Sequence, residues 1–180
     1  EKKLNISKVI VASSQFVQGE GLYECNICQN EVKPNLRSNN QLKERNWGQF
    51  CKKCKNELSW KWTNEKHISP PNAYAISKYA QEIQTIVFGS RYQIPSVALR
   101  YSIVQGPRQS LFNTYSGALR IFSLSYYHNK SPIIFEDGNQ CRDFVNIDDV
   151  VDANILALEN EKMNFGVFNV GGGRSYTVNQ

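Results

Sequence analysis

The chain has 180 residues, of which 41% are hydrophobic and 12% aromatic, and it carries a formal net charge of +5. These values fit a globular protein with one domain, or one domain and a small module, and they exclude a disordered chain. No apolar run approaches the roughly 18 to 20 residues of a membrane-spanning helix, and no signal-peptide pattern opens the chain. We therefore expect a cytoplasmic protein with no membrane partner.

Strand patterns and helix patterns alternate along the chain. Short apolar runs bounded by turn residues predict strands at residues 8–14, 94–104 and 166–173, with a hairpin at 131–145. Apolar residues at helical spacing predict helices at residues 73–92, 115–129 and 146–160. Asn72 follows two prolines and is the expected N-cap of the first helix. This alternation is typical of a mostly parallel α/β layer structure.

The positive charge is concentrated between residues 33 and 66, where nine Lys and Arg accompany three Glu and all three Trp. A basic segment with aromatic residues can bind nucleic acid or an anionic sugar nucleotide. We favour the simpler interpretation of a solvated surface whose tryptophans fill a small core. Nucleic acid is accordingly not expected as a partner.

Residues 22–66, the cysteine segment, contain two CxxC pairs separated by 22 residues, formed by Cys25, Cys28, Cys51 and Cys54. This spacing is close to that of a zinc ribbon, in which four thiolates hold one structural Zn²⁺. Two disulfides are the alternative, but a reducing cytoplasm disfavours them. Redox chemistry is a poorer fit, because one pair would have to open a helix. Cys141 is interpreted as a lone packed thiol.

Two further patterns suggest a site for proton transfer. Tyr74 and Lys78 lie four residues apart on one face of the first predicted helix. An ammonium group near a phenol favours the phenolate, which can act as a general base. By itself the pair is a weak signal, because Tyr and Lys are common and an exposed helix face is the simpler explanation. However, Ser13 and Ser14 end the first strand, and open α/β folds bind ligands at that edge of the sheet.

Read together, the motifs resemble those of the extended short-chain dehydrogenase/reductase superfamily, the NAD-dependent nucleotide-sugar epimerases and dehydratases. The matching stretches are SSQFVQG at 13–19, YAISK at 74–78, LRYSIVQGP at 99–107 and RDFVNIDD at 142–149. The cysteine segment follows Gly19-Glu20-Gly21, an arrangement most similar to dTDP-L-rhamnose 4-epimerases and UDP-glucose 4-epimerase-type enzymes. The resemblance implies a Rossmann-like parallel sheet with a zinc-ribbon-like insertion.

The resemblance also implies roles for particular residues. Ser14, Tyr74 and Lys78 are the expected catalytic residues. The expected contacts with NAD come from Tyr74, Lys78 and Tyr101, and those with a nucleotide-diphosphate sugar come from Asn113 and Arg142. The implied activity is epimerisation, at C4 and through a keto-sugar, in a protein that forms a homodimer when full length.

The implied domains follow from the same motifs. Residues 1–21 and 67–110 are expected to form part of the Rossmann-like domain, 22–66 the insertion, and 111–180 mainly the substrate-binding region with returning Rossmann segments. No GxxGxxG turn is present to receive a pyrophosphate. We therefore expect the N-terminal dinucleotide-binding half to be absent, and this portion alone to be inactive.

Some residues depart from the family pattern. Ile103 replaces an asparagine, and Gln18 and Gln105 replace tyrosines. An inactive relative whose basic insertion binds nucleic acid or protein therefore remains an alternative. A dehydratase is a further alternative, but that branch has a Thr-Asp-Glu run where this chain has Ser14, Gln15 and Phe16, which provide no acid/base pair for removing water.

Overall fold

A parallel three-stranded sheet is the centre of the computed structural model, which describes residues 5–112 and 117–180. Its strands are β1 (Val9–Ser14), β5 (Ser96–Tyr101) and β8 (Val167–Val170), in the order β1-β5-β8. The register pairs Ser14 with Tyr101, and Tyr101 with Val170. The carboxyl ends of all three strands therefore meet at one edge of the sheet.

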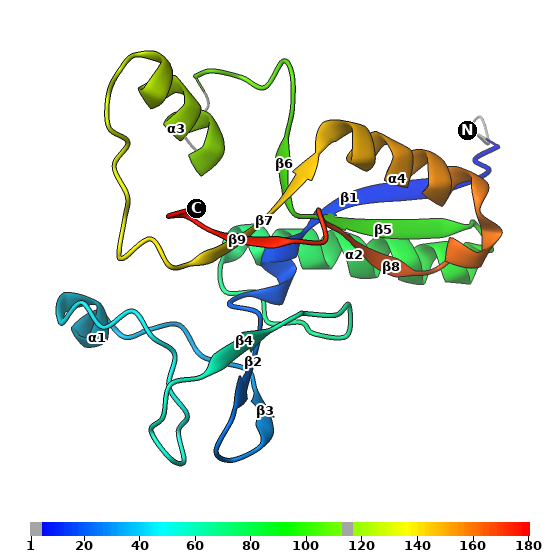
Figure 1. Ribbon diagram of the computed structural model, residues 1–180. Helices are drawn as coiled ribbons and strands as arrows, with labels where there is room; N and C mark the ends of the chain where they lie inside the picture. The colour runs from blue at the N-terminus through cyan, green and yellow to red at the C-terminus, as the bar shows by residue number, and fades with distance from the viewer. Residues whose placement is uncertain (1–4, 113–116) are drawn as a thin grey trace.

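Two helices cover the two faces of this sheet (Figure 1), namely α2 (Ala73–Tyr92) and α4 (Ile147–Glu159). Successive strand residues point to opposite faces. On β5, Val97 and Leu99 pack against Ala157 of α4, whereas Arg100 reaches Glu82 of α2. The expected α/β, Rossmann-like arrangement is confirmed. Among the described residues, no helix is both long and apolar enough to cross a membrane.

Helix α2 begins and ends at residues whose local chemistry favours a boundary. The Asn72 side chain accepts a hydrogen bond of 2.9 Å from the Ala75 amide, which confirms the expected N-cap. Gln93 ends the helix in the left-handed conformation, at φ 56°. Between them, Gly89 lies so close to Ser96 that a Cβ atom would collide with the serine hydroxyl. Glycine therefore allows α2 to approach the sheet.

A second sheet has the order β6-β7-β9 and consists of β6 (Ile103–Gln105), β7 (Cys141–Asn146) and β9 (Ser175–Thr177). The single strand expected at 94–104 is therefore wrong, because the chain changes sheets at Ser102. The Ser102 amide donates to Val170 O at 2.9 Å, and its hydroxyl donates to Asp143 Oδ2 at 2.7 Å. These two bonds hold the chain between the sheets.

The hairpin expected at 131–145 does not form, because residues 131–135 lie outside any strand. Strand β7 instead pairs in parallel with β6 and antiparallel with β9. The turn around Gly138, at φ 73°, is present, but Asn179 donates to the carbonyls of Asp137 and Gly138. Long-range partners thus replace the local strand pairing. Of the helix expected at 115–129, the structure forms α3 (Ala118–Tyr127), and residues 115 and 116 lie outside the described residues.

The cysteine segment forms a separate antiparallel sheet with the order β3-β2-β4, built from β2 (Leu22–Cys25), β3 (Asn30–Val32) and β4 (Ser59–Lys61). In Figure 1 it projects away from the parallel sheet. The remaining short elements are η1 (Gln15–Gln18), α1 (Asn39–Lys43) and η2 (Glu161–Met163).

The core of this segment is made by cysteines and Leu58, with Tyr23 and Val32 packed against them. Trp60 and Trp62 lie outside it, 48% and 61% exposed, and contact each other edge to face at 5.6 Å. The interpretation that the tryptophans fill a small core is wrong for these two. The four cysteines take the central place in this core instead.

Candidate functional site

Ser14, Tyr74 and Lys78 lie around the carboxyl end of β1. Ser14 is the last residue of β1, and its Oγ accepts a hydrogen bond of 3.3 Å from the Phe16 amide. The Phe16 ring meets the Tyr74 ring edge to face at 5.9 Å. Lys78 Nζ donates to Ala12 O of β1 at 2.9 Å. The structure thus brings the three expected catalytic residues to one edge of the sheet.

The Tyr74 side chain is 52% exposed, and its hydroxyl has no hydrogen-bond partner among the residues that the structure describes. It lies in the first turn of α2, where unpaired amides give the helix end a partial positive charge. The ammonium of Lys78 lies one turn further along. An exposed tyrosine in the first turn, with a lysine one helical turn later, provides a phenol and an ammonium group that together suit proton transfer.

A buried charged network lies directly behind these residues. Arg100 Nε and Nη2 each donate to the Glu82 carboxylate at 2.8 Å, with both side chains only 1–2% exposed. The Ser13 hydroxyl donates to the same carboxylate. Arg100 Nη1 donates to Glu65 O at 2.9 Å. One ion pair therefore ties α2, β1 and β5 to the end of the cysteine segment.

Gln18, which the sequence marks only as a departure from the family pattern, holds the same end of the segment. It is buried, and its Nε2 donates to Asn64 O at 2.9 Å and to Asn169 Oδ1 at 3.2 Å. Asn169 in turn donates to Thr63 O at 3.0 Å. A tyrosine cannot make this pair of amide bonds. The substitution therefore suits the insertion that this chain carries.

Glu82 and Gln18 were missed by the sequence analysis. A usable signal existed for Glu82, because Arg100 interrupts a strand whose neighbours are apolar, and a buried arginine requires a partner. No comparable signal existed for Gln18. Its partners Asn64 and Asn169 are 46 and 151 residues away in the chain.

The remaining expected site residues lie elsewhere. The Tyr101 hydroxyl donates to Asn154 of α4 at 3.0 Å, on the face of the sheet opposite Tyr74. Its contact with a cofactor stays a prediction. Arg142, on β7, donates to Cys141 O at 2.8 Å and has no acidic partner among the described residues. Asn113 lies outside the described residues.

The four cysteines converge as the spacing predicts. Their Sγ atoms all lie within 4.8 Å of one another, with 3.4 Å between Cys25 and Cys54 and 3.9 Å between Cys28 and Cys51. A tetrahedral Zn²⁺ with bonds of about 2.3 Å separates its sulfur ligands by about 3.8 Å. The Sγ atoms are too far apart for disulfides, whose S–S bond is about 2.05 Å. The donor set therefore fits a metal ion.

The two CxxC turns have the same backbone form. Gln29 and Lys55, each four residues after the first cysteine of its pair, adopt left-handed conformations at φ 52° and 63°. Their amides donate to the carbonyls of Cys25 and Cys51, at 2.8 and 2.9 Å. The amides of Cys54 and Lys53 lower the pKa of Cys51 to about 6. A hydrogen bond with the Cys54 thiol raises the pKa of Cys28 to about 12, so it is the second turn, at Cys51, that favours a thiolate, the form that binds metal.

Full-length protein is expected to contain about one zinc per chain, and Cys51→Ser is expected to reduce this to near zero, because three thiolates and a hydroxyl bind Zn²⁺ far more weakly. Elemental analysis after gel filtration measures the ratio. Cys141→Ser is the control, since Cys141 is not part of the cluster. A Cys51→Ser protein that retains stoichiometric zinc would contradict the assignment.

A family model for the NAD dependent epimerase/dehydratase family matches residues 55–171. A dTDP-L-rhamnose 4-epimerase of Burkholderia thailandensis is 30% identical over 176 residues, which are 96% of this chain and 46% of that protein. A solved UDP-glucose 4-epimerase of Thermotoga maritima with UDP-glucose has a TM-score of 0.70 and 31% identity, over 98% of this chain and 45% of that chain.

A solved UDP-N-acetylglucosamine 4-epimerase of Methanobrevibacter ruminantium M1, in complex with UDP-N-acetylmuramic acid, gives a TM-score of 0.67 and 32% identity, covering 97% of this chain and 44% of that chain. The chain thus spans less than half the length of the relatives it matches.

Proposed function

The chain belongs to the NAD-dependent epimerase/dehydratase family, and on this premise we propose that it is part of an NAD-dependent enzyme that epimerises a nucleotide sugar at C4. The observation that carries the proposal is the exposed Tyr74 hydroxyl, which has no hydrogen-bond partner within residues 5–112 and 117–180 and belongs, with Ser14 and Lys78, to the carboxyl edge of the sheet. The similarity to three 4-epimerases supports C4 as the reacting carbon.

The geometry supports a division of roles for proton transfer. The Tyr74 oxygen takes the proton of the sugar hydroxyl and later returns it. Ser14 Oγ already accepts from the Phe16 amide, so its own proton is free to hydrogen-bond the reacting sugar oxygen. The Lys78 ammonium stabilises the negative charge that develops on Tyr74. Together these residues would assist both the oxidation and the reduction of the sugar, because each step moves a proton at the same oxygen.

NAD, when bound, supplies the redox chemistry that converts the sugar carbinol to a ketone and back. The residues present fit its nicotinamide end, because an exposed hydroxyl at Tyr74 and an ammonium at Lys78 lie where open α/β sheets bind ligands. Lys78 would hold the ribose hydroxyls, and Tyr74 would lie beside the nicotinamide. The enzyme is proposed to act as a homodimer when full length.

A nucleotide-diphosphate sugar is the proposed substrate class, with Arg142 as its phosphate contact. The guanidinium of Arg142 is half-buried and, within the described part of the chain, unpaired with any carboxylate. A guanidinium without an acidic neighbour can form bidentate hydrogen bonds to a phosphate. Dehydration is a weaker candidate, because Gln15 and Phe16, which follow Ser14, carry no ionisable group.

The full-length protein, loaded with NAD, is expected to interconvert one C4-epimeric pair when offered UDP-glucose, UDP-N-acetylglucosamine and dTDP-L-rhamnose in turn. Proton NMR follows the H4 and anomeric signals, and absorbance at 340 nm shows whether NADH accumulates. We expect the epimer to form with no net NADH. Loss of water from the sugar would instead indicate a dehydratase, and failure with all three sugars would contradict the proposed activity.

A further inference from the structure

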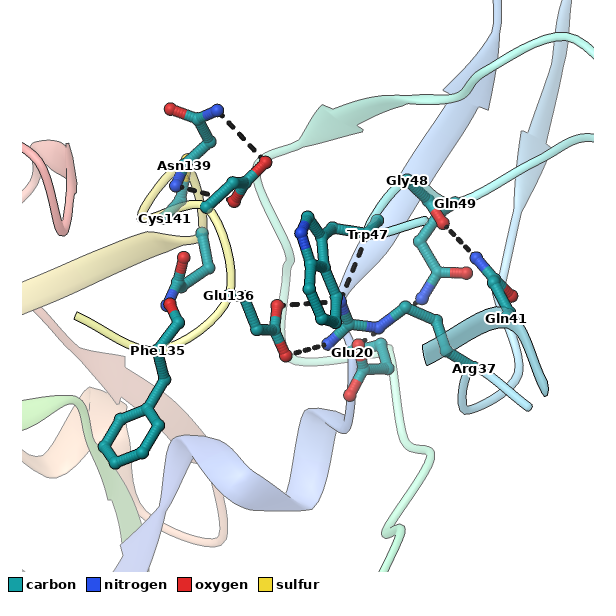
Figure 2. A network of polar contacts seen from close by, with 12 residues as sticks. Glu20, Arg37, Gln41, Trp47, Gly48, Gln49, Phe135, Glu136, Asn139 and Cys141 are labelled. Atoms are coloured by element: carbon teal, nitrogen blue, oxygen red, sulfur yellow. Dashed lines mark hydrogen bonds and ion pairs between the residues drawn. The ribbon is translucent and has the colours of Figure 1, made fainter. Parts of the chain in front are cut away.

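One arginine of the cysteine segment spans the gap to the turn before β7. Arg37 Nη1 donates to Glu136 Oε2 at 2.8 Å and Nη2 donates to Glu136 Oε1 at 3.0 Å (Figure 2). The side chains are only 21% and 26% exposed, and the two residues are 99 positions apart. Paired, parallel bonds of this kind fix both partners in orientation as well as distance.

Arg37 is itself held by the loop that precedes the third cysteine of the cluster. Its Nη1 also donates to Trp47 O at 3.2 Å, and Gly48 O accepts from the Gln41 side chain at 2.7 Å. The carbonyl oxygen of Gln49, which lies two residues before Cys51, accepts a hydrogen bond of 2.7 Å from the Leu58 amide. The backbone that positions Arg37 is therefore continuous with a cluster ligand.

At the other end of the contact, Glu136 opens the turn that leads into β7. Glu136 has a left-handed backbone at φ 59°, and the Asn139 amide closes the turn by donating to Asp137 Oδ1 at 3.0 Å. After Gln140, Cys141 and Arg142 are the first residues of β7. The position of the turn therefore sets where β7, and with it Arg142, begins.

The ion pair joins two separate parts of the chain, the cysteine segment and the turn before β7. In Figure 2 the Arg37 side chain points toward Glu136, which precedes Asn139 in that turn. The described contacts between the two parts thus centre on Arg37.

From these contacts we infer that Arg37 is a positioning residue, through which the metal-bound cysteine cluster holds residues 136–142 in place on the substrate side. The inference rests on the proposed function in one respect only, the role of Arg142 as a phosphate contact. Metal at the cluster then orders a part of the substrate site without touching the reacting atoms.

Hydrogen exchange of the full-length protein tests the contact without requiring activity. Arg37→Ala is expected to speed amide exchange in peptides covering 131–142 by about three- to fivefold, as for loss of a partly exposed ion pair. Removing zinc from the wild type with a chelator should give a similar increase. In Arg37→Ala, the chelator should add little in these peptides. Glu136→Gln should behave as Arg37→Ala does.

Lys43→Ala is the matched control, because Lys43 is an exposed cation of the same segment that forms no ion pair among the described residues. Its exchange in 131–142 should match the wild type. Unchanged exchange in Arg37→Ala, or an equal effect of the chelator in Arg37→Ala and wild type, would overturn the inference. Where a substrate is in hand, Arg37→Ala should also raise KM about three- to fivefold with kcat unchanged.

Discussion

In the full-length protein, Tyr74→Phe is expected to reduce turnover of the nucleotide sugar by about 10²- to 10⁴-fold, the usual contribution of a positioned general acid/base. The ring and its contact with Phe16 remain, so only the hydroxyl is lost. Because that hydroxyl has no hydrogen-bond partner among the described residues, folding should be affected by less than about 0.5 kcal/mol. Steady-state kinetics and urea unfolding measure the two effects separately.

Tyr79→Phe is the matched control for this experiment. Tyr79 belongs to the same helix, five residues beyond Tyr74, and five residues are about 140° around a helix, so its hydroxyl points away from the proposed site. We expect Tyr79→Phe to keep the wild-type turnover. If Tyr74→Phe kept more than about a tenth of the wild-type turnover, Tyr74 could not be the base of the reaction.

The second large effect concerns stability. Arg100→Met in the full-length protein is expected to lower the free energy of unfolding by about 3–5 kcal/mol, because it leaves the buried Glu82 carboxylate without its partner. The Ser13 hydroxyl alone cannot offset that charge. Equilibrium unfolding in urea, followed by circular dichroism, measures the change.

The double variant Glu82→Leu/Arg100→Met separates the cost of an unpaired charge from that of altered packing. Removing both charges should recover much of the lost stability, since a buried ion pair and a well-packed apolar pair often have similar net stability. A double variant as unstable as Arg100→Met would show that packing, and not the isolated carboxylate, causes the loss. Ser13, which belongs to this network, directly precedes Ser14 of the proposed site. Comparing the turnover of the double variant with that of Arg100→Met would therefore show whether the network also positions the proposed site.

Much of the fold followed from local patterns. The N-cap at Asn72, helix α2 and the convergence of the four cysteines all depend on residues a few positions apart or on regularly spaced ligands. The ends of the strands were harder to predict from the sequence. The run 94–104 has the pattern of one continuous strand, and only Ser102, bonded to both β8 and β7, divides it between two sheets.

The expected hairpin at 131–145 failed for a related reason. Its DG turn is real, but a turn fixes only local direction, and β7 found partners in β6 and β9. Local sequence cannot rank a neighbouring strand against one 30 or more residues away, because the difference depends on which faces the rest of the fold buries.

By itself, the sequence determined which groups this protein has for chemistry and how they are spaced: a tyrosine and a lysine one helical turn apart, a serine at a strand end, and two CxxC pairs. Only the tertiary structure decided what surrounds them. The pairs Arg100–Glu82, Gln18–Asn169 and Arg37–Glu136 join residues 18, 151 and 99 positions apart. Side-chain periodicity reports on one element at a time, whereas these bonds exist because folding brings separate elements together and leaves buried charges and amides that must be paired.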